Sequence, residues 1–553
     1  MPQSTFDYVI VGAGSAGCVL ADRLSADGSS KVLVLEAGGS DRSIFIQMPS
    51  ALSIPMNMPR YNWFYHTEPE PQLGGRRLHT PRGKVLGGSS SINGLVYVRG
   101  NPLDFEQWEA GGARGWGYRD VLPYFRRAEK RAAGEDLYRG GSGKLHTSRG
   151  TLANPLNAAW LEAGRQAGYP LTADMNGFQQ EGFGAMDMTV GGGRRCSAAR
   201  AYLRPAMRRS NVSVQAHALV TRILFEGRRA VGVSYLRGGT EHVARASREV
   251  IVSSGAINSP QLLKLSGVGP APELRALNIP VVHELPGVGE NLQDHLEFYF
   301  QVACREPITL YKYQNAWGRA LIGARWLLLH DGLGATNHFE TGGFIRSRAG
   351  IRFPDIQFHF LPMAVSYDGS SLAREHGFQA HVGPMRSKSR GWVRLATANA
   401  EDKPKVFFNY MSHPDDWTEM HACVRLTREI FAQSAFDRFR AREIQPGAGV
   451  QTDEQIDAFV REHVESAYHP SCTCKMGADT DPMAVVDRHL AVRGLEGLRV
   501  VDSSVMPSIT TGNLNAPTIM LAEKAADHIL DRPLLPREDA PFYVAPDWER
   551  RQR

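Results

Sequence analysis

The run Phe6-Asp-Tyr-Val-Ile-Val-Gly-Ala-Gly-Ser-Ala-Gly17 determines how the beginning of this chain folds. Tyr8 to Val11 is short, apolar and rich in β-branched residues, which predicts a buried parallel strand. The glycines that follow have the spacing G-x-G-x-x-G, and residues 18–24 are predicted to form a helix. Because a helix N-terminus attracts anions, this strand–turn–helix unit predicts a site for the pyrophosphate of a dinucleotide.

Each glycine of the motif has its own expected role. Gly12 permits the tight turn, Gly14 lets the backbone approach the pyrophosphate, and Gly17 lets the helix lie close to the strand. A second predicted strand, 32–35, ends at Glu36, whose carboxylate can accept hydrogen bonds from ribose hydroxyls. This acid makes NADP the least expected dinucleotide. The position of the strand at the start of the chain and the further Gly-rich segments favour FAD over NAD.

Composition describes an ordinary globular protein of more than one domain. The chain has 553 residues, 42% hydrophobic and 22% charged, with a net charge of +6 that is spread along the sequence. Six cysteines in this length do not make a disulfide framework, and no metal-ligand spacing is present. We expect no signal peptide, no nucleic-acid partner and no membrane-spanning segment, which would need roughly 18 apolar residues in a row. The Arg-rich end, 548–553, is compatible with contact with an anionic surface.

A change of composition near residue 296 predicts a second domain. Between 296 and 446 the strand-like runs 353–362 and 392–395 accompany a long predicted helix, 417–433. After this stretch, a strand at 498–502 and a helix at 514–529 predict a return to the first domain. We therefore expect an α/β fold in which a discontinuous, Rossmann-like FAD-binding domain accompanies a mostly antiparallel α+β substrate domain. The expected limits are 1–155, 190–300 and 467–535 for the FAD-binding domain, 156–189 and 301–466 for the substrate-binding domain, and 536–553 for a C-terminal tail.

Four ordered motifs carry a family likeness. They are Gly83-Lys-Val-Leu-Gly-Gly-Ser-Ser-Ser-Ile-Asn93, the segment 255–269, the pair His469-Pro470, and Gly512-Asn-Leu-Asn-Ala-Pro517. In these the chain resembles the glucose–methanol–choline flavin oxidoreductases along nearly its whole length. The resemblance implies FAD as the cofactor. In some relatives a histidine directly after the paired serines binds the flavin covalently; here Ile92 stands in that place, so we expect non-covalent FAD.

The resemblance and the dinucleotide motif together identify candidate cofactor-binding residues. They are Gly12, Gly14, Ser15, Ala16, Gly17, Glu36, Ala37, Val85, Gly88, Asn93, Gly94, Leu95, Val96, Val220 and Asp502.

The chemistry of alcohol oxidation requires a base near the hydroxyl and a hydrogen-bond donor for the developing alkoxide. His469 matches the catalytic histidine of the family. Asn515 matches the second member of the catalytic pair, where many relatives have another histidine. Since asparagine does not titrate, it can only form hydrogen bonds, which favours a single base.

The substrate half of the chain is similar to choline-oxidising members of the family. This likeness implies oxidation of choline to betaine aldehyde, a step of glycine betaine synthesis. A quaternary ammonium offers no hydrogen-bond donor, so aromatic ring faces and negative charge must hold it. Trp63 and Tyr468 are the best-matched aromatic residues, Phe339 or Glu340 could complete the pocket, and His359 resembles a substrate-positioning histidine. Phe339 and Glu340 point opposite ways if they lie in a strand, and sequence does not choose between them.

Other interpretations stay open at this point. The enzyme could oxidise another alcohol (aromatic, aliphatic or sugar), or be a cyanohydrin lyase, which keeps FAD on the same fold without net redox chemistry. The electron acceptor could be oxygen or a membrane quinone. The sequence also leaves open a homodimer and a cytoplasmic protein that binds peripherally to the inner face of the cell membrane.

Overall fold

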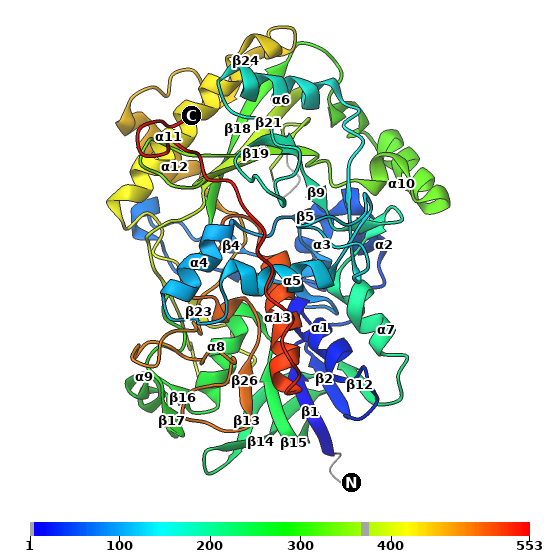
Figure 1. Cartoon of the computed structure of the whole chain (residues 1–553), viewed down its shortest axis with the longest axis vertical. Coiled ribbons are helices and arrows are strands. Elements are labelled where there is room, and N and C mark those ends of the chain that lie inside the picture. The colour runs from blue at the N-terminus through cyan, green and yellow to red at the C-terminus, as the bar shows by residue number, and fades with distance from the viewer. Residues whose placement is uncertain (1–4, 367–374) are drawn as a thin grey trace.

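The computed structural model describes residues 5–366 and 375–553. Two large sheets organise these residues, one in the lower and one in the upper half of Figure 1. The strands of the lower sheet are β1 (Thr5–Val11), β2 (Val32–Glu36), β12 (Val212–Ala216), β13 (Leu219–Glu226), β14 (Arg229–Arg237), β15 (Thr240–Val252) and β26 (Leu498–Val500).

The lower sheet has a parallel part and an antiparallel edge. β2 and the end of β15 pair in parallel on either side of β1, β12 extends the sheet beyond β2, and β26 pairs in parallel with β15. The hairpin β13–β14 adds the antiparallel edge through β15. All of β2 is buried, as is β1 from Tyr8 onward, which explains why both are continuous apolar runs.

Helices that follow the parallel strands start at one edge of this sheet. α1 (Ser15–Leu24) follows β1 and α8 (Gly255–Leu265) follows β15, while α13 (Asn515–Ile529) packs between α1 and α5 (Tyr118–Ala128). A Cβ atom at Gly17 would lie 2.0 Å from the carbonyl oxygen of Gly12, so only glycine allows α1 to approach the turn this closely. The carboxyl ends of the strands and the helix N-termini therefore converge, as at a dinucleotide site.

The upper sheet is antiparallel and has its own aromatic core. Helices α6 (Pro155–Gln166) and α11 (Pro414–Phe431) pack against its strands, and α12 (Asp453–His463) packs on α11. Trp160 lies at the centre of this core, stacked on Phe360 with 5.1 Å between ring centroids. The strands are β8 (Gly182–Ala185), β18 (Leu296–Cys304), β19 (Thr341–Ile345), β20 (Ile356–Leu361), β21 (Gly377–Pro384), β24 (Arg440–Gln445) and β25 (Glu465–Ser466).

Shorter elements connect the two sheets and cover them. β5, β9, β7 and β6 form a four-stranded sheet, and the other short strands pair two by two. The short strands are β3 (Tyr65–His66), β4 (His79–Thr80), β5 (Val96–Tyr97), β6 (Glu129–Arg131), β7 (Leu145–Arg149), β9 (Asp187–Met188), β10 (Val190–Gly191), β11 (Arg194–Arg195), β16 (Val268–Gly269), β17 (His283–Glu284), β22 (Trp392–Arg394) and β23 (Lys405–Phe407). The remaining helices are α2 (Ile44–Gln47), α3 (Ser53–Met56), α4 (Pro102–Ala110), α7 (Arg204–Ala206), α9 (Ala271–Ala276) and α10 (Ala316–Leu329). Single turns are η1 (Pro49–Ala51), η2 (Pro71–Leu73), η3 (Gly88–Ser91), η4 (Ala199–Leu203), η5 (Leu310–Tyr313), η6 (Gly332–Ala335), η7 (Ser434–Phe436) and η8 (Ser503–Val505).

The architecture confirms the predicted fold class, with a parallel α/β part and a mostly antiparallel α+β part. The domain limits stay a prediction, and the limit at residue 300 falls inside β18. The C-terminal segment, red in Figure 1, runs from α13 up to α11. Its basic end is held within the chain, because Arg553 pairs with Glu429 at 2.6 Å and Arg346 donates to the carbonyl oxygen of Arg551. In the described part of the chain, no helix combines the length and apolar character needed to span a bilayer.

Candidate active site

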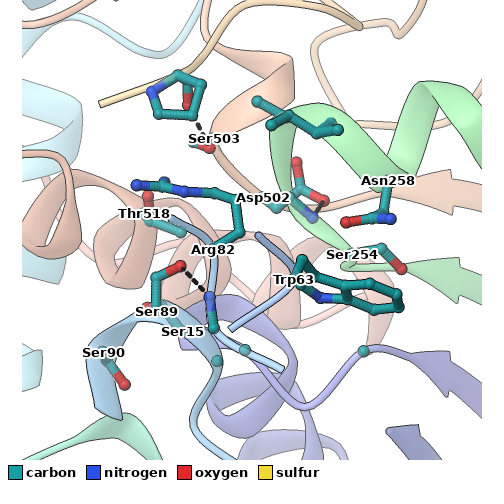
Figure 2. A pocket seen from close by; sticks show the side chains of 18 of the residues that line it. Ser15, Trp63, Arg82, Ser89, Ser90, Ser254, Asn258, Asp502, Ser503 and Thr518 are labelled. Carbon is teal, nitrogen blue, oxygen red and sulfur yellow. Dashed lines mark hydrogen bonds between the residues drawn. The ribbon is translucent and has the colours of Figure 1, made fainter. Parts of the chain in front are cut away.

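A cavity lies where the parallel strands of the lower sheet end. It reaches from the β1–α1 turn to β20 of the upper sheet, and polar side chains such as Ser15, Arg82 and Asp502 surround it (Figure 2). The predicted cofactor-binding residues that line it are Gly12, Gly14, Ser15, Ala16, Glu36, Ala37, Gly88, Asn93, Gly94, Leu95, Val96, Val220 and Asp502. The predicted catalytic and substrate residues that line it are His469, Asn515, Trp63, Phe339, His359 and Tyr468.

Three predicted site residues lie outside the lining. Gly17 packs α1 onto the turn, as described above, and Val85 is fully buried next to Gly39. Glu340 faces away from the cavity, because its carboxylate accepts hydrogen bonds from the Leu152 N–H (2.8 Å) and the Thr336 hydroxyl (2.9 Å). Of the two alternatives that the sequence left open, Phe339 therefore lines the cavity, while the carboxylate of Glu340 holds the backbone at Leu152.

The features of the cavity fit an FAD molecule. No side chain caps the N-terminus of α1 at Gly14, so the first N–H groups of this helix are available to a pyrophosphate. A Cβ atom at Gly14 would find only the Ser253 carbonyl oxygen, at 3.8 Å, within 4 Å, which shows that this side of the turn is open. The hydroxyl of Ser253, which also lines the cavity, is buried without a hydrogen-bond partner in the described residues. Buried polar groups need partners, and a polar ligand here would supply one.

Two acids shape the cofactor side of the cavity. Glu36 accepts the N–H groups of Ala13 (2.9 Å) and Gly38 (2.8 Å), and burial raises its pKa to about 7. Asp502 accepts from the Gly255 N–H (2.8 Å) and the Ser259 hydroxyl (2.6 Å), which fixes the start of α8 against the end of β26. Both carboxylates therefore hold backbone of the dinucleotide motif or of α8 while they line the cavity.

A chain of hydrogen bonds ends at His469 and determines which of its two ring nitrogens carries the proton. The Nε2 atom of His295 lies 3.0 Å from the carbonyl oxygen of Met385, which can only accept, so His295 carries its proton on Nε2. Burial lowers the pKa of His295 to about 4, so its Nδ1 is an acceptor at neutral pH. The Nδ1 atom of His469, 3.0 Å away, must then be the donor. This leaves Nε2 of His469 with a lone pair, as a base requires.

The two asparagines of the last motif, Asn513 and Asn515, contact different residues of the site. Asn513, which the sequence analysis did not single out, donates from Nδ2 to Nε2 of His469 at 3.1 Å. Its Oδ1 lies 3.3 Å from Nε2 of His359. The Oδ1 of Asn515 accepts the hydroxyl of Ser15 at 2.9 Å. Among the described residues, no hydrogen bond leaves the amide nitrogen of Asn515, so this donor is available to a ligand in the cavity.

Aromatic rings and a buried carboxylate lie around this polar cluster. Phe339 meets His359 edge-on with 5.9 Å between ring centroids. Glu297 pairs with His381 at 3.0 Å, and both side chains are buried. Burial lowers the pKa of His359 to about 4 against the opposing effect of the Glu297 charge. Burial also raises the pKa of Tyr468, and the charges of Glu465 and Glu297 raise it further.

Trp63 lies elsewhere on the lining, and its ring is partly covered. It stacks on Tyr65 with 5.9 Å between centroids, and the ammonium of Lys84 lies 4.6 Å from its ring centroid. Figure 2 shows Trp63 next to Ser254 and Asn258, near the start of α8. A substrate cation would compete with Lys84 for this ring.

Several site residues were not found from the sequence. Arg82 donates to the carbonyl oxygen of Tyr468, and burial lowers the pKa of Arg82 to about 10. Asp294 accepts the backbone N–H of His469 at 2.7 Å. Arg82 directly precedes the first Gly-rich family motif, and Asn513 lies inside the last one, so position in a motif was a usable signal for both.

Comparison with known proteins defines the class to which this site belongs. The chain matches the GMC oxidoreductase family over residues 6–297 and 387–522. It belongs to this family, and it is an FAD-dependent alcohol oxidoreductase.

Individual relatives cover nearly the whole chain. The oxygen-dependent choline dehydrogenase of Photobacterium profundum is 57% identical over 100% of this chain and 97% of its own length. The protein with the same name from Vibrio vulnificus is 58% identical over 100% and 99%. Among solved structures, pyridoxine 4-oxidase from Mesorbium loti is similar with a TM-score of 0.86 and 30% identity, over 95% of this chain and 99% of that one.

Proposed function

We propose that the chain oxidises choline to betaine aldehyde, with His469 as the base and Asn515 as a hydrogen-bond partner. The observation that carries this proposal is the position of His469. Its Nε2 faces Asn513 in a cavity that is also lined by Phe339 and Tyr468. The names of the relatives above support choline as the substrate, and the same names make oxygen the first electron acceptor to test, before a quinone.

The proton of the alcohol has a defined destination. Oxidation of a primary alcohol removes a proton from oxygen and a hydride from carbon, and FAD, when bound, supplies the hydride acceptor. Burial lowers the pKa of His469 well below its ordinary value, and the neighbouring His295, His359 and Arg82 lower it further. His469 is therefore neutral in the free protein, and its Nε2 can accept the hydroxyl proton when the substrate hydroxyl replaces the N–H of Asn513 at this nitrogen. Asn513 and Asn515 both line the cavity, and their amide nitrogens can donate to the developing alkoxide.

The trimethylammonium group also has a defined environment. It needs ring faces and negative charge rather than hydrogen bonds. Phe339 and Tyr468 supply ring faces beside His359, and the buried Glu297 pairs with His381, whose ring contacts Phe339 at 5.2 Å between centroids. Each cation–π contact contributes about 0.5–2 kcal/mol. Two such contacts would favour choline over its neutral isostere, 3,3-dimethylbutanol, on the order of 100-fold.

The test compares specificity constants for choline and for 3,3-dimethylbutanol in the wild type and in two variants. We expect the preference for choline to fall in Phe339→Leu by about tenfold, because a ring face is lost while the apolar volume is nearly kept. Trp63→Leu is the matched variant, and the preference should fall less there because Lys84 already lies over that ring. Equal constants in the wild type would refute choline and leave a dehydrogenase of another alcohol. If choline does not reduce the flavin under anaerobic conditions but a cyanohydrin is cleaved, the chain is a lyase.

His295 gives a second prediction, as a positioning residue for His469. In His295→Leu the Nδ1 acceptor is lost, the tautomer of His469 is no longer fixed, and we expect the anaerobic rate of flavin reduction by choline to fall about tenfold or more. His295→Asn keeps an oxygen acceptor at nearly the Nδ1 position and should retain most of the rate. The KM for choline should stay within a few fold in both. Equal losses in the two variants would assign His295 a purely structural role.

A further inference from the structure

One deeply buried arginine of the chain has no acidic partner. Arg195, in β11, is 0% exposed, and burial lowers the pKa of its guanidinium to about 9, so the group stays charged at neutral pH. The other arginines buried to a similar degree, Arg99, Arg139 and Arg346, each form an ion pair with a carboxylate. Within the described residues Arg195 forms none, and its Nη2 atom is buried without a hydrogen-bond partner. A buried charge is costly unless it is compensated, so a ligand that brings negative charge would stabilise this one.

The guanidinium of Arg195 fixes the orientation of the Asn93 side chain. Its Nη1 donates to both the backbone oxygen and the Oδ1 of Asn93, each at 2.7 Å, while its Nε donates to the carbonyl oxygen of Ile46 at 2.8 Å. The backbone N–H of Leu95 donates to the same Oδ1 at 3.2 Å. Because a guanidinium and a backbone N–H can only donate, the atom that they share must be the amide oxygen.

The amide nitrogen of Asn93 is therefore left for the cavity. Asn93 lines the cavity, and its Nδ2 makes no hydrogen bond to any of the described residues. With Oδ1 held from behind by Arg195, this nitrogen is a donor in a defined position. A donor that is oriented in advance can hydrogen-bond to a bound ring without reorganisation.

The neighbours of Asn93 border the catalytic end of the cavity. Ile92 belongs to an apolar cluster against which Tyr468 packs, and a Cβ atom at Gly94 would lie 3.9 Å from the ring of Phe339. FAD, when bound, accepts the hydride from the alcohol, so its reacting ring must lie at the end of the cavity that holds His469. This step rests on the proposed role of His469. Asn93, and Arg195 behind it, thus border the space for that ring.

The charge of Arg195 matches what the reaction adds to this space. A hydride brings two electrons and one proton, so the flavin ring becomes more negative by one unit when it accepts one. A fixed cation in dry surroundings stabilises such a charge. We propose that Arg195 is a positioning residue for the flavin, which directs the Nδ2 donor of Asn93 into the cavity and raises the reduction potential of bound FAD through its own charge. The identity of the alcohol does not enter this proposal.

The experiment measures the midpoint potential of the flavin in the purified holoenzyme, by reductive titration against a reference dye and without any alcohol. In Arg195→Met, which loses the charge and keeps most of the volume, the equilibrium constant for reduction should fall by at least about tenfold, the scale of one hydrogen bond to a charged group. For a two-electron couple this fall lowers the potential by about 30 mV. Arg195→Lys keeps the charge, and the constant should change by less than about threefold.

Two further variants separate charge from folding. Arg346→Met is the matched control, because Arg346 is also buried but is paired with Glu181 and lies outside the cavity lining. Its flavin should keep the wild-type potential even where the protein is less stable. Asn93→Asp neutralises Arg195 without removing it, and the potential should fall as it does in Arg195→Met. This variant also decides the question if Arg195→Met does not fold.

The outcomes are distinct. A wild-type potential in Arg195→Met, or in Asn93→Asp where Arg195→Met does not fold, refutes the proposal. An equal fall in Arg195→Met and Arg195→Lys refutes the role of charge, and a loss of flavin content with an unchanged potential in the remaining holoenzyme makes Arg195 purely structural. Because no alcohol is present, a failure of choline to reduce the flavin would leave these potentials as they are.

Discussion

Replacing His469 with alanine is expected to slow the anaerobic reduction of bound flavin by choline by about 100-fold or more, the scale of general-base catalysis. His469 has a lone pair on Nε2 because its proton lies on Nδ1, which donates a hydrogen bond to Nδ1 of His295. His359 is held differently, because its Nε2 lies 3.0 Å from Nε2 of Gln357 and 3.3 Å from Oδ1 of Asn513. Stopped-flow absorbance at the flavin band measures the rate directly.

The loss must come from chemistry rather than from the fold. FAD content and thermal stability should remain close to those of the wild type, because the alanine leaves the β1–α1 turn and the start of α8 untouched. Added imidazole, which can enter the vacated volume, should restore part of the rate. A wild-type rate of flavin reduction in His469→Ala would refute the assignment, and a rate that falls only together with FAD content would assign the residue to cofactor binding.

Local sequence patterns predicted the parts of the site that depend on neighbouring residues. The turn after β1 follows from three glycines in fixed spacing, and α1 ends at Leu24 as predicted but begins at Ser15, three residues before the predicted start at Cys18. Strand alternation also explains why His359 points away from Phe358 and Phe360: both rings are in the core while His359 lines the cavity. In each case the determining interactions lie within a few residues.

Contacts between distant segments could not be predicted in the same way. His295 and Asp294 lie more than 170 residues before His469, and nothing in a single sequence pairs them with it. Phe339 and Glu340 lie just before β19, not in a strand, and the sequence gave no reason to prefer either one, because Leu152, which engages Glu340, comes from another segment. Likewise, the sequence of an apolar helix such as α10 does not predict whether the helix is buried or exposed, because this depends on what packs against it.

The glycines of the dinucleotide motif allow a sharper test of the cofactor site, because their surroundings differ. Gly14 has φ −78° and ψ −162°, an extended conformation that valine adopts readily, and its Cβ would meet nothing but the Ser253 oxygen at 3.8 Å. A valine there should fold, and its side chain should project into the space left for the pyrophosphate. At Gly17, by contrast, a Cβ would lie 2.0 Å from the Gly12 oxygen, so Gly17→Val should destabilise the fold itself.

We therefore expect Gly14→Val to weaken FAD binding on the order of 100-fold, the upper range for forcing extra methyl groups into an occupied space, while the apoprotein melts like the wild type. Gly449→Val is the matched control, since a Cβ there has no neighbour within 4 Å and the residue lies outside the cavity lining. Flavin is measured in the supernatant after acid precipitation, where non-covalent FAD must appear because Ile92 offers no atom for a covalent bond.

Normal flavin content in Gly14→Val would place the pyrophosphate elsewhere. Flavin that stays in the pellet of the wild type would show a covalent attachment through another residue. Loss of both flavin and thermal stability would mean that the turn, rather than the ligand, requires glycine at this position.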